Sequence, residues 1–179
     1  MNKIRPNLLL IAGTGTKSGK TTVACKIIEQ FKTLNITAIK ISPHFHETTA
    51  GLNPISEDKG YAIYLETDKT SSKDTSRMLN SGASIVFFAK VWDDQLLEVF
   101  NKIFDMIPTG TPVICESPVL RNFIEPGVFI IMSSLTVNKH KNISHLQDLP
   151  HLMFKLEELG NTATLPIGFD DGKWFISPH

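Results

Sequence analysis

Short apolar runs alternate with amphipathic stretches along most of the chain. The continuous runs are typical of strands that are covered on both faces of a sheet. They lie at residues 8–12, 36–41, 85–89, 112–115 and 128–132, and a further strand is expected at 61–65. Apolar residues at helical spacing predict a helix at 21–34 and another that begins at Asp93 or Asp94. This alternation predicts an α/β fold with a mostly parallel central sheet.

The remaining segments are less regular. Residues 43–60 contain several turn-prone clusters and are interpreted as a long functional loop, because unstructured loops of this length are uncommon without a role. Asp74 is placed to cap a short helix that carries Met78 and Leu79. Near the end of the chain, apolar residues on either side of Asp171-Gly172 predict a hairpin over 167–176.

Length and composition bound the class of protein. The 179 residues, of which 41% are hydrophobic, suit a single domain over 1–179 that can bury a core. Because 18 Lys and Arg balance 18 Asp and Glu, bulk charge argues against a nucleic-acid partner or an anionic membrane. No apolar run approaches the roughly 20 residues that cross a bilayer. The cysteines, Cys25 and Cys115, suit a reducing compartment, so we expect a cytoplasmic protein.

The strongest chemical signal is the segment 13–22, Gly-Thr-Gly-Thr-Lys-Ser-Gly-Lys-Thr-Thr, between a predicted strand and a predicted helix. Small residues let backbone N–H groups turn toward phosphate oxygens, Lys20 can reach the β- and γ-phosphates, and Thr21 can ligate Mg²⁺. Thr14 stands where the phosphate-loop pattern has its first glycine, and the alternative is a glycine-rich turn that merely begins a helix. The residues expected to contact the nucleotide here are Gly15, Thr16, Lys17, Ser18, Gly19, Lys20, Thr21 and Thr22.

A magnesium site beside such a loop needs carboxylates as well. Glu116 directly follows the predicted strand at 112–115, and the carboxyl end of a parallel strand faces the same crevice as the loop. Glu116 is therefore a candidate ligand of the metal or of a water molecule, the alternative being a solvated strand end. Asp68 and Asp74 are further candidates, and the sequence does not decide which of the three carboxylates binds the metal.

Two other segments carry weaker signals. His44 and His46 share one face of an extended segment, which suits a metal, a hydrogen bond to a triphosphate or plain solvation. The segment Asn138-Lys139-His140-Lys141 partly matches the guanine-reading Asn-Lys-x-Asp signature, but Lys141 stands where that signature has Asp. A solvated basic turn is the plainer interpretation of it.

The order of these features resembles the molybdopterin-guanine dinucleotide biosynthesis protein B (MobB) family. The resemblance covers residues 7–133, and Ser117 stands where the family has glycine. Residues 134–179 have no counterpart in it. It depends on Lys17-Ser18-Gly19-Lys20-Thr21-Thr22, on Ile39-Lys40 with His44 and His46 beyond, on Lys73-Asp74-Thr75-Ser76-Arg77 with Ser81-Gly82-Ala83, and on Glu116.

The resemblance implies a three-layer P-loop NTPase fold, often dimeric, that binds GTP with Mg²⁺ and hydrolyses it slowly. It also implies an adapter role in making the molybdenum dinucleotide cofactor, with a cofactor-biosynthesis protein as partner. By position, Lys20 and Thr21 would serve the phosphates and Mg²⁺. Asp74 and Glu116 would approach the metal or the γ-phosphate, and catalysis would use them together with Lys20. The other residues carried over into the crevice are Lys40 and His44.

The opening Gly-Thr-x-Thr at 13–16 is also similar to dethiobiotin synthetase and to the cobyrinic acid amide synthases. The alternative function is therefore an ATP-dependent small-molecule ligase, with the 43–60 loop as a cover over the substrate. A chain of 179 residues is short for these ligases. A third hypothesis is a nucleotide-binding module without hydrolysis, which the altered Glu-Ser-Pro segment at 116–118 motivates. The choice between GTP and ATP stays open.

Overall fold

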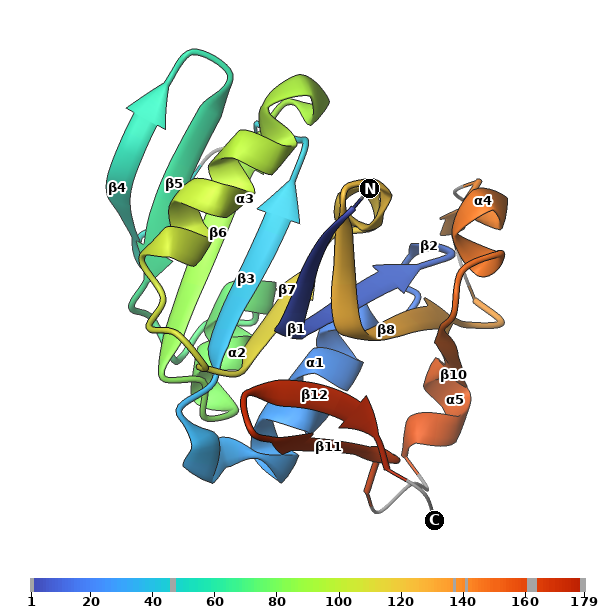
Figure 1. Cartoon of the computed structure of the whole chain (residues 1–179). Helices are drawn as coiled ribbons and strands as arrows, with labels where there is room; N and C mark the ends of the chain where they lie inside the picture. The colour runs from blue at the N-terminus through green and yellow to red at the C-terminus, as the bar shows by residue number, and fades with distance from the viewer. Residues whose placement is uncertain (1, 46–47, 137, 141, 161–163, 178–179) are drawn as a thin grey trace.

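An eight-stranded sheet runs through the middle of the computed structural model, with helices on both of its faces (Figure 1). The structure describes residues 2–45, 48–136, 138–140, 142–160 and 164–177. The strand order is β10-β8-β1-β7-β3-β6-β5-β4, and the strands from β10 to β6 are parallel to one another. The last two strands, β5 and β4, add to this sheet as antiparallel neighbours. The expected α/β fold with a mostly parallel sheet is confirmed.

The elements follow the chain in the order that the apolar pattern predicts. The strands of the large sheet are β1 (Lys3–Gly13), β3 (Thr37–Ser42), β4 (Leu52–Asp58), β5 (Tyr61–Glu66), β6 (Ile85–Val91), β7 (Val113–Glu116), β8 (Ile124–Ser133) and β10 (Leu152–Lys155). The helices are α1 (Lys20–Gln30), α2 (Asp74–Asn80), α3 (Leu96–Asp105), α4 (Ser144–Gln147) and α5 (Leu156–Leu159), with 3₁₀ turns at Lys32–Leu34, Asp93–Gln95 and Val119–Asn122. Two small sheets pair β2 (Gly15–Thr16) with β9 (Asn138–His140) and β11 (Ile167–Asp170) with β12 (Lys173–Ile176).

Strand β1 is apolar on both faces because each face is buried in a separate core. Leu8 and Leu10 point into the core that α3 and α4 cover, whereas Leu9 and Ile11 point into the core that α1 and α2 cover. Both cysteines are free and buried, as expected of small core residues. None of the helices within the described ranges has the length and apolar character needed to cross a membrane.

The helix predicted at 21–34 is shorter than its apolar spacing suggests. Helix α1 ends at Gln30, and a 3₁₀ turn continues to Leu34. Asn35 then adopts the left-handed conformation, with φ of 53°, that ends helices. This residue therefore ends the helical segment.

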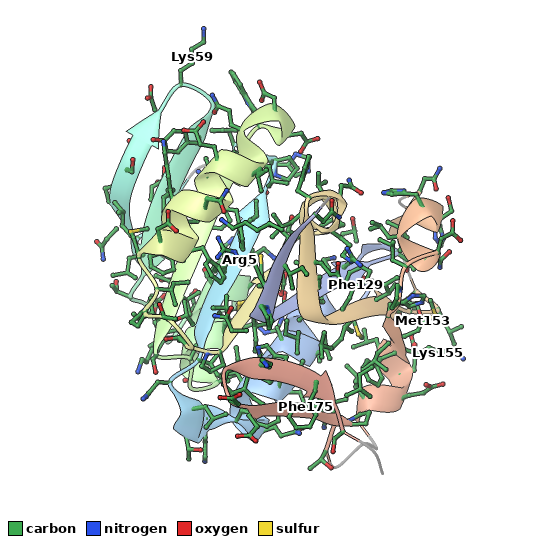
Figure 2. All side chains as sticks on the ribbon, in the orientation of Figure 1. Arg5, Lys59, Phe129, Met153, Lys155 and Phe175 are labelled. Atoms are coloured by element: carbon green, nitrogen blue, oxygen red, sulfur yellow. The ribbon has the colours of Figure 1, made fainter. Side chains whose placement is uncertain are left out.

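The prediction of a long loop at 43–60 is wrong for the second half of this range. Residues 52–58 form strand β4, which pairs with β5 across a turn at Lys59-Gly60, and Figure 2 shows Lys59 at its tip. Pro54 argues against a strand in the sequence, because proline lacks the N–H that a regular ladder needs. The strand tolerates it because β4 lies at the edge of the sheet and the register shifts directly after Pro54. The turn-prone cluster at 58–60 is the turn of a hairpin.

Residues 134–179, for which the sequence indicates only a hairpin, contribute to both the sheet and the core. Strand β10 is the outermost parallel strand, beside β8. The expected hairpin forms as β11 and β12, and Trp174 from it is buried among the side chains of the α1 face. The Trp174 indole N–H donates to the Val113 carbonyl at 3.2 Å, and the Gln30 side chain bonds both backbone groups of Leu165. The C-terminal segment is therefore part of the core of the sheet.

Candidate functional site

The glycine-rich loop, residues 13–19, turns sharply between β1 and α1. Lys17 and Gly19 have positive φ angles of 62° and 92°, and such left-handed positions turn neighbouring N–H groups toward one concave side. The loop is also closely packed: a Cβ on Gly13 would lie 2.1 Å from the Ser18 hydroxyl. Ser18 itself is fully buried. The small residues that the sequence has here are therefore required by the shape of the loop.

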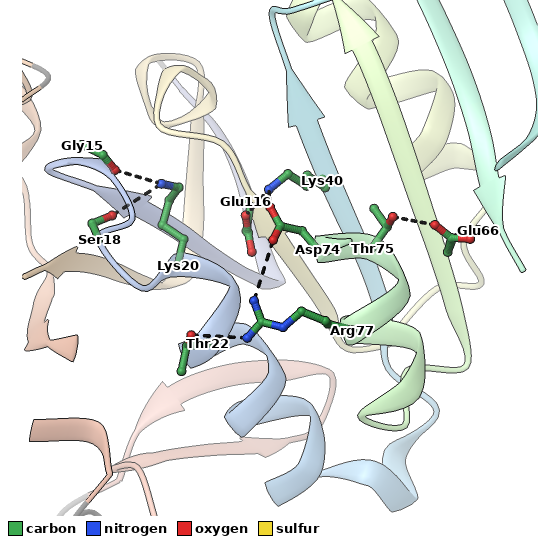
Figure 3. A network of polar contacts seen from close by, with 10 residues as sticks. All are labelled: Gly15, Ser18, Lys20, Thr22, Lys40, Glu66, Asp74, Thr75, Arg77 and Glu116. Carbon is green, nitrogen blue, oxygen red and sulfur yellow. Dashed lines mark hydrogen bonds and ion pairs between the residues drawn. The ribbon is translucent and has the colours of Figure 1, made fainter. Parts of the chain in front are cut away.

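The Lys20 side chain folds back over this loop. Its ammonium donates to the Gly15 carbonyl at 3.3 Å and to the Ser18 hydroxyl at 3.4 Å (Figure 3). Lys20 is also the first residue of α1, so its positive charge is added to the positive end of the helix dipole. A cation and a helix N-terminus thus face the same concave side, which is the arrangement that favours an anion.

The loop opens into a cleft of about 580 Å³ at the carboxyl ends of β7, β3 and β6. In open parallel sheets, ligands bind at this edge of the sheet. Apart from Asp68 and His46, the residues that the sequence predicts for the nucleotide, the metal or catalysis line this cleft. These residues are Gly15, Thr16, Lys17, Ser18, Gly19, Lys20, Thr21, Thr22, Lys40, His44, Asp74 and Glu116.

Lys40, Asp74 and Glu116 form a charged cluster on the wall of the cleft. The Lys40 ammonium donates to the Asp74 carboxylate and, at 3.0 Å, to the Glu116 carboxylate (Figure 3). Burial by itself lowers the pKa of Lys40, but the charges of Glu116 and Asp74 outweigh burial and raise that pKa. Burial likewise favours a higher pKa for Asp74, but the Lys40 ammonium holds it below its ordinary value of 3.8.

Glu116 has one oxygen in the ion pair and one without a partner. Its side chain is 2% exposed, and within the described residues its Oε1 is buried and has no hydrogen-bond partner. A buried carboxylate oxygen is costly to leave unsatisfied, so this oxygen is suited to accept a bond from water or to bind a cation. The described residues contain no group of three or more His, Cys, Asp or Glu that could hold a metal by themselves. A metal here would need ligands from elsewhere as well.

Helix α2 places Asp74 in the cleft. The buried Glu66 at the end of β5 accepts a hydrogen bond from the Thr75 hydroxyl at 2.6 Å, which fixes the first turn of α2. The expectation that Asp74 caps this helix is wrong, because Lys73 is the N-cap and no side chain bonds the free N–H groups there. Asp74 lies in the first turn instead, and its carboxylate bonds Lys40.

Arg77 is a residue of the cleft that the motif analysis did not select as a site residue. It lies one turn after Asp74, its guanidinium is 3.8 Å from the Asp74 carboxylate, and it donates to the Thr22 hydroxyl at 3.4 Å. The i, i+3 spacing of Asp74 and Arg77 was the available signal. Asp93 and Leu156 also line the cleft without a motif that selects them.

The other candidates from the sequence divide between the cleft and its surroundings. Asp68 lies outside the lining of the cleft, where its carboxylate accepts from the backbone and the hydroxyl of Thr70, both at 2.7 Å. His44 lines the cleft, but His46 lies outside the described residues. The segment that partly matches the guanine signature reaches the glycine-rich loop through the pairing of β9 with β2, whereas Lys141 lies outside the described residues.

The lowered pKa of Asp74 predicts an acid-dependent contribution to stability. A carboxylate whose folded pKa is depressed stabilises the fold above its unfolded pKa, and this contribution is lost as pH falls through the folded pKa. The difference in unfolding free energy between the wild type and Asp74→Asn should therefore narrow below about pH 4. Urea unfolding at several pH values measures it, with the exposed Asp94→Asn as the control for one lost charge. If the difference in unfolding free energy stays constant with pH, the pKa of Asp74 is not lowered by folding.

Comparisons with protein-family models, with curated proteins and with solved structures find no match for this chain. These comparisons therefore assign neither a family nor a function to the chain.

Proposed function

We propose that the chain is a P-loop protein that binds a nucleoside triphosphate with Mg²⁺ and hydrolyses it slowly. The observation that carries the proposal is the juxtaposition of two features in one cleft. The Lys20 ammonium lies over a loop of small residues at the start of α1, and the buried Glu116 carboxylate lines the same cleft. A triphosphate needs the first feature and its metal needs the second.

The phosphates would be held by the loop and by Lys20. Backbone N–H groups of the loop and the N-terminus of α1 supply partial positive charge at no cost in reorganisation. Lys20 would exchange its long hydrogen bonds to Gly15 and Ser18, at 3.3 Å and 3.4 Å, for charge-assisted bonds to phosphate oxygens. Catalysis would consist of positioning and of neutralising charge around the γ-phosphate.

The residues of the cleft also fit a magnesium ion. The unpartnered Oε1 of Glu116, the Asp74 carboxylate and the Thr21 hydroxyl all belong to the lining of the cleft, and these oxygen ligands are the type that Mg²⁺ prefers. Mg²⁺ is commonly bound through one or two carboxylates plus phosphate oxygens and water, so a complete protein cage is not needed. The ion would neutralise charge on the phosphates.

A more specific proposal follows from the resemblance to MobB. The chain would be a GTP-binding adapter of a P-loop NTPase fold that assists a protein partner in cofactor biosynthesis. What supports this is that the separate segments of the resemblance, which include Lys40, His44, Asp74 and Glu116, meet in one cleft. Ser117, which stands where the family has glycine, lies in the same lining. Because the site differs from the family here, the identity of the protein partner needs a test of its own.

The ligase alternative has weaker support. The loop that would cover a second substrate is shorter than the sequence suggests, because residues 52–58 form β4. The feature in its favour is that Asp93 and Leu96, which are not assigned to the triphosphate, also line the cleft and would be available to a second small molecule.

Isothermal titration calorimetry with GTP and ATP, each with Mg²⁺, tests the proposed function. We expect binding of a triphosphate that weakens when EDTA removes the metal, with slow release of phosphate. Preference for GTP supports the adapter, whereas preference for ATP with turnover stimulated by a small carboxylic acid supports the ligase. Binding without phosphate release over hours would support the third hypothesis, a nucleotide-binding module without hydrolysis. Absence of binding to either nucleotide would refute the proposal.

A further inference from the structure

Lys40 occupies the place where the proposed function requires a divalent cation. Its ammonium bonds the carboxylates of both Asp74 and Glu116, the acidic residues of the lining that are assigned to the metal (Figure 3). Lys20 and Arg77 bring further positive charge to the same cleft. A divalent cation that enters before any nucleotide would therefore meet two carboxylates that already bond Lys40, with the charges of Lys17, Lys20 and Arg77 in the same lining.

We propose that Lys40 holds the cation position between Asp74 and Glu116 while the cleft lacks a nucleotide, and that it thereby makes metal binding depend on the nucleotide. The inference rests on the proposed function and deepens it. Lys40 acts here as a positioning residue that competes with the metal, and the triphosphate is the ligand that decides the competition.

The burial of the Glu116 and Lys40 side chains indicates which of these two moves. Glu116 is 2% exposed and is fixed at the end of β7, whereas the Lys40 side chain is 20% exposed. Lysine is a compact charge on a flexible four-carbon chain, so its ammonium can leave a site without moving the backbone. The Glu116 carboxylate remains in place, and its unpartnered Oε1 stays available to the incoming cation.

The nucleotide supplies the force for the exchange. A triphosphate brings several negative charges to the end of the cleft where Lys20 lies, and Lys40 lines the same cleft. Attraction to the phosphates draws the Lys40 ammonium away from Asp74 and Glu116 at the moment when Mg²⁺ arrives with the nucleotide. Metal without nucleotide then binds weakly, because it must displace an ammonium that already bonds both carboxylates.

The test measures free Mn²⁺ by electron paramagnetic resonance in the absence of nucleotide. Lys40→Met should bind Mn²⁺ at least about tenfold more tightly than the wild type, because the carboxylates lose their competing charge. Lys73→Met is the matched control, since it removes the same charge from an exposed residue next to Asp74, and its affinity should equal that of the wild type. Adding Glu116→Gln to Lys40→Met should abolish the gain.

A second measurement uses the unmodified protein, because Lys40→Met leaves Glu116 buried without its partner and can fail to fold. In the presence of a non-hydrolysable GTP or ATP analogue, the wild type should bind Mn²⁺ more tightly than it does without the analogue. The affinity of the protein–analogue complex for Mn²⁺ should also exceed that of the free analogue by about tenfold or more. Equal Mn²⁺ affinity in Lys40→Met and the wild type, or an equal gain in Lys73→Met, would overturn the inference and leave the proposed function intact.

The two proposals fail in distinguishable ways. Nucleotide titration with Mg²⁺, on the same samples, decides the proposed function by itself. If no analogue binds there, the proposed function is wrong and the coupling falls with it, even if Lys40→Met exposes a cation site. If an analogue binds but leaves the Mn²⁺ affinity of the wild type unchanged, only the role of Lys40 is wrong.

Discussion

Replacement of Lys20 by alanine is expected to weaken triphosphate binding by about 100-fold, which corresponds to roughly 2.7 kcal/mol. The ammonium would make charge-assisted bonds to phosphate oxygens in a partly enclosed cleft, and hydrogen bonds to charged groups are worth about 1.5–3 kcal/mol. In the fold itself the same ammonium makes long bonds, at 3.3 Å and 3.4 Å, to groups of its own loop. Stability should therefore change by less than about 1 kcal/mol.

Calorimetric titration with the preferred triphosphate and Mg²⁺ measures this loss. Lys32→Ala is the matched control, because Lys32 is an exposed lysine of the 3₁₀ turn that follows α1 and lies outside the cleft. Its affinity should match that of the wild type. A Lys20→Ala protein that is folded by circular dichroism and binds the nucleotide as tightly as the wild type would remove the phosphate loop from the explanation.

Replacement of Trp174 by alanine is expected to destabilise the fold by about 3–5 kcal/mol. The indole is 2% exposed, packs edge-to-face against Phe31 and Phe169, and donates to the Val113 carbonyl at 3.2 Å. The substitution therefore leaves a cavity between the hairpin and α1 and removes the partner of a buried carbonyl. Because one side chain joins β12, α1 and β7, its loss affects the whole cooperative unit.

Urea unfolding monitored by circular dichroism gives the change in stability. Phe175→Ala is the control within the same hairpin, since the Phe175 ring is 42% exposed and its loss should change stability by less than about 1 kcal/mol. Figure 2 shows this ring on the hairpin. An unchanged urea midpoint for Trp174→Ala would mean that the C-terminal hairpin does not belong to the core.

The local sequence pattern predicts most of the parallel strands in their chain order and the sharp bend of the glycine-rich loop. Strands buried on both faces read as continuous apolar runs, so β1 and β8 were predictable from local pattern, although each proved longer than its run. The bend at 13–19 was predictable because it needs small residues at adjacent positions, which the sequence has. Lys20 and Thr21 follow this loop directly. Contacts between near neighbours leave a trace in local spacing.

The resemblance brings Lys40, Asp74 and Glu116 to one crevice, but the ion pairs among them are known from the tertiary structure and not from any local pattern. Lys40 is 34 residues from Asp74 and 76 from Glu116, and no local period records that their strand and helix ends converge on one cleft. Strand β4 escaped detection because an edge strand is half exposed and tolerates proline, so its sequence resembles a loop. The roles of β10 and of Trp174 could not be predicted from local pattern either. Each depends on a distant neighbour, β8 for β10 and Val113 for Trp174, that the folded sheet brings next to it.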